Sequence, residues 1–396
     1  RSIVQISREN MEWKKEANKL RRASINLSGY SGTNVHTVFE EAPAKPISES
    51  MDAPFVFNFS AKEKPALLAL IQKYNEDDSW KNYSPTEIAY TLSRRNLFEQ
   101  RFSIQAGSIE QLAQKLQSHT NDENGELIFA TPEVNNELSL CFQFTGQGAQ
   151  YTGMCKGLYD KFDVYKNIVD YCDKELEKHI AVSLKDILWI DGSKTNLIHQ
   201  TQYTQPCLFV VEFAMAKLLL SFGIQPSVLI GHSIGEITAL AIAEVLSLES
   251  ALKLVAVRGQ LMQSISSQNG AMAAVFASGE VIAQYNQDKK VEIAGYNTPQ
   301  NTTITGDKND VDLFVKVLRE NHIKAVPLQV SHAFHSKAMD EILDAYREFC
   351  STLHFAQPQI PIASNIDGKI IKENEFNADY LCLQLRQAVH YLQGIE

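Results

Sequence analysis

A short β-branched apolar run that ends at Ile230 leads directly into the pattern G-x-S-x-G at residues 231–235. The run has the composition of a strand, and the residues after the pattern have that of a helix. Glycine at both ends of the pattern permits a sharp strand-to-helix turn, because no Cβ atom obstructs it. Such a turn presents Ser233 at a helix N-terminus, beside the free amide of Ile234. Ser233 is therefore a candidate nucleophile, although these five residues alone also fit a glycine turn with a surface serine.

A second glycine-punctuated loop follows another apolar run, at residues 140–144. Gly146 and Gly148 flank Gln147 there and allow its backbone amide to face a ligand. One amide from this loop and the amide of Ile234 would together make an oxyanion hole, which stabilises the negative charge that develops on a carbonyl oxygen during acyl transfer.

Two histidines, His332 and His335, lie just past a strand-like segment at residues 325–330. Loops at strand ends often carry functional residues. A lone histidine is more often structural, but a serine nucleophile needs a group with a pKa near neutrality to remove and return its proton. One of these two histidines is therefore the candidate base.

Residues 248–263 have the apolar periodicity of a helix, and Arg258 lies on the apolar stripe. Arg258 is therefore expected to point inward. A buried guanidinium is costly unless an anion meets it. That anion is either an acidic side chain in an internal salt bridge or a carboxylate of the substrate, and the residue pattern alone leaves both open. The other members of the stripe are Ala251, Leu254, Val255, Leu261, Met262 and Ile265.

Four motifs occur in an order and spacing that resemble the malonyl-type acyltransferase domains of modular polyketide and fatty acid synthases. They are F-T-G-Q-G-A-Q at 144–150, G-H-S-I-G-E at 231–236, V-R-G-Q-L-M-Q at 257–263 and H-A-F-H-S at 332–336. The resemblance covers about residues 138–396. It implies an enzyme of the acyltransferase class.

The resemblance also implies a role for each candidate residue. Ser233 would be the nucleophile and His335 its base, oriented by a backbone carbonyl in the loop at 388–391 and not by an acidic side chain. The backbone amides of Gln147 and Ile234 would form the oxyanion hole. The residues expected to bind the substrate are Arg258, Phe334, His332, Gln147 and Asn297.

The reaction implied by this family is transfer of a malonyl-type extender unit from coenzyme A, through an acyl-serine, to the phosphopantetheine thiol of an acyl carrier protein. No cofactor of the domain itself is expected, and the partners would be the carrier protein, the acyl-coenzyme A and a parent ketosynthase domain. In this family the H-A-F-H form, with Phe334, implies selection of malonyl over methylmalonyl, because a phenyl ring there would fill the space of a C2 methyl group; such a difference supports about 1 to 3 kcal/mol of discrimination. Cys155 and Lys337 depart from the usual family residues and leave room for an unusual C2-substituted or carrier-borne malonyl unit.

The resemblance divides the chain into three parts. Residues 1–44 resemble the C-terminal tail of a ketosynthase, which indicates that the chain is a piece of a larger synthase. Residues 45–137 resemble the linker domain between ketosynthase and acyltransferase, with capping boxes at 84–87 and 108–111 that predict two helix starts. Residues 138–396 would be the acyltransferase domain.

The expected fold class is α/β. Residues 271–330 have a βαββαβ order, which predicts a ferredoxin-like small subdomain inserted into an α/β-hydrolase-like large subdomain. Ser233 would lie on the large subdomain and His335 at the exit of the small one. The active site is therefore expected in the cleft between them.

Composition excludes several function classes. The net charge of −10 provides no basic surface for nucleic acid. Six cysteines without C-x-x-C spacing favour free thiols in the cytoplasm, and no metal site is indicated. Glu212 and Lys217 interrupt the apolar run at 208–220, so no membrane span is expected.

Two other functions remain compatible with the residues. The order Ser233, Asp307, His335 fits a serine α/β-hydrolase, in which Asp307 would be the acid of the triad. A serine hydrolase, however, does not need a buried cation such as Arg258 to bind a substrate carboxylate. The chain could also be a non-catalytic scaffold, since its first third has a structural character only.

Overall fold

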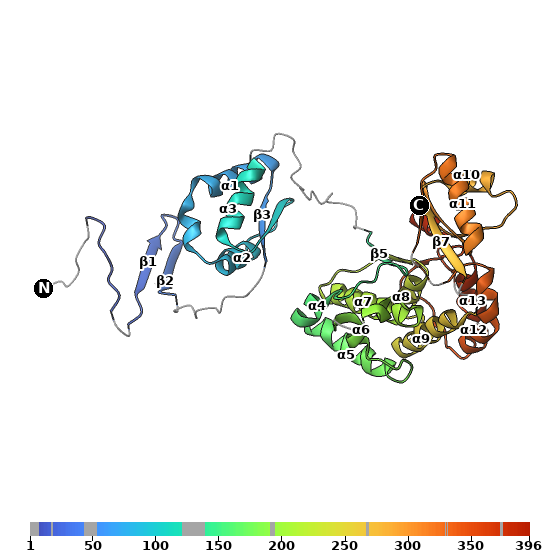
Figure 1. Ribbon diagram of the computed structural model, residues 1–396. Coiled ribbons are helices and arrows are strands. Elements are labelled where there is room, and N and C mark those ends of the chain that lie inside the picture. Colours follow the sequence, from blue (N-terminus) through green and yellow to red (C-terminus); the bar gives the residue numbers. More distant parts are fainter. Residues whose placement is uncertain are drawn as a thin grey trace. The chain divides into compact units, whose positions relative to one another are not determined.

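The computed structural model shows two compact units, Arg1–Asn136 and Glu137–Glu396 (Figure 1). The predicted boundaries at 44/45 and 137/138 fall on or beside residues outside the described set, and they stay predictions. The described residues are 8–16, 19–42, 54–120, 139–190, 195–266, 269–328, 330, 332–372 and 375–396.

In the first unit, β1 (Arg22–Ser28) pairs antiparallel with β2 (Asn34–Glu40). Every residue of both strands is exposed, including Leu27, Val38 and Phe39. A two-stranded hairpin of this kind is marginally stable alone.

A separate core of the first unit lies between an antiparallel strand pair and three helices. The strands are β3 (Phe55–Ala61) and β4 (Gln100–Ala106), and the helices are α1 (Lys64–Glu76), α2 (Pro85–Ser93) and α3 (Ile109–Thr120), with a short 3₁₀ turn at Asp78–Asn82. Alternate strand residues such as Phe57 and Phe59 are buried, because successive side chains of a strand point to opposite faces. The helices contribute Leu67, Ile71, Ile88, Leu92, Leu112 and Leu116 to the same core.

The two predicted capping boxes differ in detail. At the start of α2, the Ser84 hydroxyl accepts from the Glu87 amide and the Glu87 carboxylate accepts from the Ser84 amide, which confirms a complete box. At the start of α3, Ser108 Oγ accepts from the Gln111 amide as predicted (3.2 Å). The Gln111 side chain, however, accepts from the amide of Gly107 (2.6 Å), one residue earlier than expected.

The large subdomain of the second unit contains a parallel three-stranded sheet in the order β11-β6-β5. The middle strand, β6 (Val228–Gly231), is almost wholly apolar and buried, as parallel strands covered on both faces usually are. Its neighbours are β5 (Cys141–Phe144) and β11 (Ile362–Ala363). Of the helices in this subdomain, α8 (Ile234–Ile242) and α14 (Tyr391–Ile395) contact β6 directly. The others include α7 (Thr201–Ser221), α9 (Leu248–Ser264), α12 (Leu343–Cys350) and α13 (Ala378–Arg386), with 3₁₀ turns at Thr195–His199 and Lys337–Ile342.

Helix α7 is long and apolar enough to cross a membrane by length and composition, with a mean hydropathy of 1.3. The prediction that Glu212 and Lys217 would exclude this was therefore too strict. About 67% of the helix window is buried inside the protein, where α7 packs against α8 and α9. A core helix passes the same test, so the helix is weak evidence for a membrane span.

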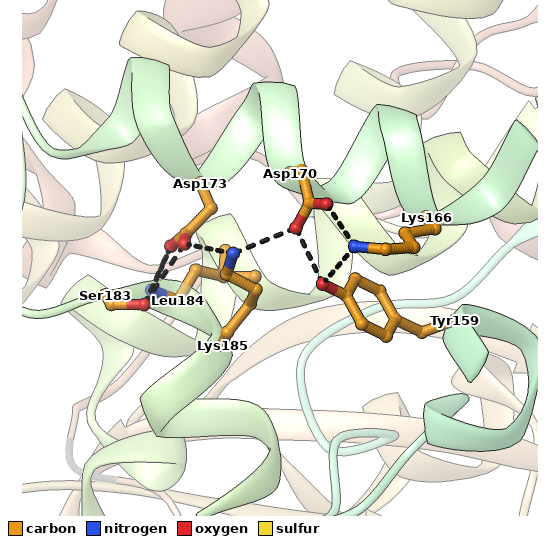
Figure 2. A network of polar contacts seen from close by, with 7 residues as sticks. All are labelled: Tyr159, Lys166, Asp170, Asp173, Ser183, Leu184 and Lys185. Carbon is orange, nitrogen blue, oxygen red and sulfur yellow. Dashed lines mark hydrogen bonds and ion pairs between the residues drawn. The ribbon is translucent and has the colours of Figure 1, made fainter. Parts of the chain in front are cut away.

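Three further helices, α4 (Lys156–Lys161), α5 (Asp163–Leu176) and α6 (Leu184–Trp189), are joined by polar contacts that we call the α4–α6 network (Figure 2). Asp173, on α5, accepts from the Leu184 amide (2.6 Å) and so satisfies a free amide at the start of α6. The carboxylate of Asp170 accepts from three side chains, those of Tyr159 (2.8 Å), Lys166 (2.6 Å) and Lys185 (2.9 Å).

The small subdomain has the predicted βαββαβ order and an antiparallel sheet in the order β10-β7-β9-β8. This strand order is the ferredoxin-like one, and the predicted α/β fold class is confirmed. The elements are β7 (Gly270–Val275), α10 (Gly279–Tyr285), β8 (Glu292–Thr298), β9 (Asn301–Asp307), α11 (Lys308–Glu320) and β10 (Ala325–Pro327). Of the strand predicted to extend to Val330, Gln329 lies outside the described residues.

Candidate active site

The turn at 231–235, which we call the elbow, joins the end of β6 to the start of α8. Ser233 has φ +54° and ψ −108°, a backbone conformation that non-glycine residues rarely adopt. A Cβ atom on Gly231 would lie 2.1 Å from the Glu236 nitrogen, and one on Gly235 would lie 2.5 Å from the Phe144 carbonyl oxygen. Both glycines are therefore required for the close approach of backbone segments at the elbow.

Ser233 and His335 are in direct contact. Ser233 Oγ lies 2.8 Å from His335 Nε2, and His335 Nδ1 lies 2.9 Å from the carbonyl oxygen of Gln387. The loop expected to orient the histidine was 388–391, so the acceptor is one residue earlier than that range. Because the carbonyl accepts the Nδ1 proton, Nε2 is left to accept a proton from Ser233. Burial, followed by the positive charge of Arg258, lowers the pKa of His335 to about 3 and keeps the ring neutral near pH 7.

Arg258 is 1% exposed, as its place on the apolar stripe of α9 predicts. Its Nη2 donates to Ser233 Oγ (3.2 Å), so the guanidinium and the histidine meet at one oxygen. Within the described part of the chain, no carboxylate forms an ion pair with Arg258, and its Nε has no hydrogen-bond partner. Burial is also the main cause that lowers the pKa of this guanidinium. The internal salt bridge that the sequence allowed is thus not found among these residues.

A cavity of about 110 Å³ opens above the elbow. Its wall is mainly apolar and includes Met262, Met272 and Leu328. Such a cavity, with a few converging polar groups, is the usual form of a small-ligand site. Six of the eight residues that the sequence predicts at the site line it, namely Gln147, Ser233, Ile234, Arg258, Phe334 and His335.

Two other residues expected at the substrate site do not line this cavity. His332 is 1% exposed, and its ring lies beside that of Phe334, with 6.1 Å between centroids. Asn297 lies behind residues of the cavity wall. Its Oδ1 lies 2.9 Å from His232 Nε2, and its Nδ2 donates to Thr303 Oγ1 (3.0 Å). Asn297 thus contacts His232, which does line the cavity.

Several residues at the site were not identified from the sequence. Gln205 lines the cavity from α7, and Asn365 and Gln384 bind the backbone of Ser233. Asn365 is the second residue after the parallel strand β11, and polar residues at the carboxyl ends of parallel strands are frequent in ligand sites. That position was the one signal available, since Gln384 lies within a helix and has no distinguishing pattern.

The hydrolase alternative required Asp307 beside His335. Asp307 instead caps α11, where its Oδ1 accepts from the Asn309 amide (2.9 Å), and its Oδ2 accepts from Asn269 (2.7 Å). The carbonyl of Gln387 occupies the hydrogen-bonding position at His335 Nδ1. Among the described residues, no group of three or more His, Cys, Asp or Glu side chains could hold a metal ion.

Comparison with known families agrees with this geometry. The family model for the acyl transferase domain matches residues 141–396, and that for the ketoacyl-synthetase C-terminal extension matches residues 1–104. Mycoketide-CoA synthase from Mycobacterium tuberculosis is 34% identical over 95% of this chain. The chain spans 9% of that protein and no more than a quarter of the other first-ranked curated relatives.

Solved structures give the same result. The acyl transferase domain of SpnD, in complex with 2-(pent-4-yn-1-yl)malonyl, is 27% identical, with a TM-score of 0.77 over 86% of this chain and 80% of that one. Malonyl-CoA:acyl carrier protein transacylase from Xanthomonas oryzae is 31% identical, with a TM-score of 0.59 over 66% of this chain and 83% of that one. The chain therefore belongs to the acyl transferase domain family and is an acyltransferase of the polyketide synthase kind, with the fold of the malonyl-CoA:acyl carrier protein transacylases.

Proposed function

We propose that this domain transfers a malonyl unit from coenzyme A to an acyl carrier protein through an acyl ester of Ser233. The observation that carries the proposal is the position of Ser233 Oγ, which lies 2.8 Å from a neutral histidine and 3.2 Å from a buried guanidinium without a carboxylate partner among the described residues. The histidine supplies a base for the serine. The guanidinium supplies a ligand for a carboxylate on the acyl group, which is what distinguishes malonyl from a simple acyl chain.

In the first half-reaction, Ser233 Oγ attacks the thioester carbonyl while its proton moves to His335 Nε2. The Nδ1–H···O hydrogen bond to Gln387 fixes the ring and stabilises the imidazolium that forms. The backbone amides of Gln147 and Ile234, both beside the cavity, would donate to the developing oxyanion. His335 then protonates the thiolate of coenzyme A as the tetrahedral intermediate collapses, which leaves malonyl-serine.

In the second half-reaction, the phosphopantetheine thiol of the carrier protein attacks the ester, with His335 as base again. Ser233 regains its proton and the carrier leaves as the malonyl thioester. Transfer prevails over hydrolysis only if water is excluded from the ester. The apolar wall of the cavity, which includes Met262, Met272 and Phe334, favours that exclusion.

The choice of malonyl over a C2-substituted unit is supported by Phe334, which is 6% exposed and lies on the cavity wall. One similar structure is described as a complex with a 2-(pent-4-yn-1-yl)malonyl group, so this fold can hold substituted malonyl units. A C2-substituted or carrier-borne malonyl unit is therefore the second candidate. Phe334 is the residue expected to decide between the two.

The domain assignment is part of the same proposal. Residues 138–396 would be the acyltransferase domain, 45–137 the linker domain and 1–44 the tail of a ketosynthase. The exposed apolar side chains of β1 and β2 support the last assignment, since they require a surface that a ketosynthase domain would provide.

The test is intact-protein mass spectrometry after incubation with malonyl-, methylmalonyl- and acetyl-coenzyme A. The protein should gain malonyl mass fastest, and Ser233→Ala should gain none while it keeps its melting temperature. Subsequent addition of phosphopantetheinylated carrier protein should remove the acyl mass and transfer it to the carrier. A malonyl adduct on Ser233→Ala, or none on the unaltered protein, would contradict the proposal, and the second result would favour a scaffold.

A further inference from the structure

Two amide side chains from a distant part of the chain bind the backbone around Ser233. Asn365 Oδ1 accepts from the Ser233 N–H (2.8 Å), and Asn365 Nδ2 donates to the Gly231 carbonyl (2.6 Å). Gln384 Nε2 donates to the Ser233 carbonyl (2.7 Å). The two side chains lie 132 and 151 positions from Ser233 in the sequence. Both polar backbone groups of this one residue are therefore held by tertiary contacts.

The amide of Asn365 is itself fixed in place. The residue is 2% exposed, and its backbone N–H donates to Glu236 Oε1 (2.9 Å) in the first turn of α8. Tyr380 Oη donates to the same carboxyl oxygen (2.6 Å). Gln384, which is also 2% exposed, lies one turn further along α13 than Tyr380. The segment from β11 to α13 is thus attached to both sides of the elbow.

Ser233 needs such support because of its backbone conformation. At φ +54° and ψ −108° a serine is strained, and a strained residue persists only when its surroundings hold it. A relaxed backbone would carry Oγ away from His335 Nε2, since the side chain moves with its Cα atom. The contacts from Asn365 and Gln384 act on the strained residue itself.

We propose that Asn365 and Gln384 are positioning residues that hold the elbow in its reactive conformation, an inference that depends on the proposed role of Ser233 as nucleophile. Asn365 suits this task because one planar amide carries both an acceptor and a donor. Aspartate would keep the bond from the Ser233 amide but place an oxygen against the Gly231 carbonyl. Methionine in place of Gln384 would keep the volume but remove the donor.

The test compares Asn365→Asp with the matched control Asn377→Asp. Asn377 lies in the same segment and caps α13 by accepting from the Tyr380 amide (2.9 Å), a bond that aspartate also makes. At saturating malonyl-coenzyme A, Asn365→Asp should lose about 10²-fold in the single-turnover rate of acylation, the typical effect of a misplacement near 1 Å. Asn377→Asp should match the unaltered protein. Binding of malonyl-coenzyme A, measured in a Ser233→Ala background, should be unchanged by Asn365→Asp.

A second variant and a second probe keep the result decisive. If Asn365→Asp does not fold, Gln384→Met provides the same comparison, with a smaller expected loss because one bond is removed. Labelling by a fluorophosphonate reports the reactivity of Ser233 without a malonyl group, so it tests the elbow even if malonyl-coenzyme A is not the donor. Folded variants that acylate and label at the unaltered rate would overturn this inference and leave the proposed function standing. If the unaltered protein transfers no malonyl but the variants label slowly, the proposed function would fail and this inference would stand.

Discussion

Two polar networks in the second unit differ in whether their ionisable side chains form ion pairs. In the α4–α6 network, the carboxylate of Asp170 lies within hydrogen-bond reach of two lysines, and its side chain is 34% exposed (Figure 2). The second network, which we call the elbow network, is formed by Ser233, Glu236, Arg258, His335, Asn365 and Gln384. The carboxyl group of Glu236 and the guanidinium of Arg258 are both buried there. No ion pair is found for Arg258 or Glu236 among the described residues.

The pKa values of the two carboxyl groups express this difference. Partial burial alone would raise the pKa of Asp170, but hydrogen bonds from Lys166, Lys185 and Tyr159 outweigh it and lower that pKa to about 2. Burial raises the pKa of Glu236 to about 7, despite hydrogen bonds from Tyr380 and Asn365. The carboxylate of Asp170 is thus paired within the protein, whereas the buried Arg258 forms no ion pair among the described residues.

The largest expected effect comes from the base of the elbow network. His335→Ala should slow self-acylation by about 10² to 10⁴-fold, the usual contribution of a positioned general base. His332→Ala should lose much less, because His332 does not line the cavity. Rapid-quench measurement of malonyl-enzyme formation checks this. A larger loss for His332→Ala than for His335→Ala would show that His332, and not His335, is the base.

The second prediction tests whether Arg258 is reserved for a substrate carboxylate. Arg258→Ala should lose malonyl transfer by a factor equivalent to about 2 to 5 kcal/mol, since a buried carboxylate would then be unpaired. Transfer of acetyl should persist or increase, because Ser233 and His335 are unchanged. Parallel rates with malonyl- and acetyl-coenzyme A provide the measurement. Equal losses for both, with a lowered melting temperature, would make Arg258 a structural residue and remove the contrast between the networks.

The third prediction concerns the protonation of Glu236. A carboxyl group whose pKa is about 7 in the folded protein and 4.5 in a model compound binds its proton more tightly when folded, so stability falls as pH rises from 4.5 to 7. The full effect is on the order of 3 kcal/mol. Glutamine resembles the protonated acid, because it can accept from Tyr380 and Asn365 and has a donor at the other position. Glu236→Gln should therefore match the unaltered protein at pH 5 and exceed its free energy of unfolding at pH 8.

Denaturant titrations of both proteins at the two pH values give this comparison directly. The difference between them isolates Glu236, since Glu212, whose pKa burial also raises to about 7, is present in both. A variant that is less stable by the same amount at both pH values would show that Glu236 is ionised in the folded state.

The smallest effect is expected in the α4–α6 network. Asp170→Asn should change the free energy of unfolding by only about 1 kcal/mol, because ion pairs open to solvent contribute little and this side chain is only partly buried. The rate of malonyl-enzyme formation should not change. Thermal denaturation and the acylation assay check the two statements. A large loss of activity would show that the network influences the elbow and that the two networks are not independent.

Much of the site was predictable from the sequence because its geometry is local. The elbow requires two glycines beside Ser233, and the apolar period of α9 places Arg258 inside the protein, so both follow from neighbouring residues. The ferredoxin-like order of the small subdomain was predictable for the same reason, since alternating strand and helix patterns lie within 271–330. The full exposure of β1 and β2 was not predictable, because their apolar side chains, such as Val38 and Phe39, give no sign of it.

The sequence by itself determined the sharp turn at Ser233, the inward direction of Arg258 and the α/β class, since each depends on residue patterns within short stretches of chain. Only the tertiary structure decided which carbonyl meets His335, that Asn297 contacts His232 outside the cavity lining, and that Asn365 and Gln384 hold the backbone of Ser233. The physical reason is that these contacts join residues between 52 and 151 positions apart. Hydrogen bonds at that separation depend on how strands and helices pack, and a local pattern of residue types does not predict that packing.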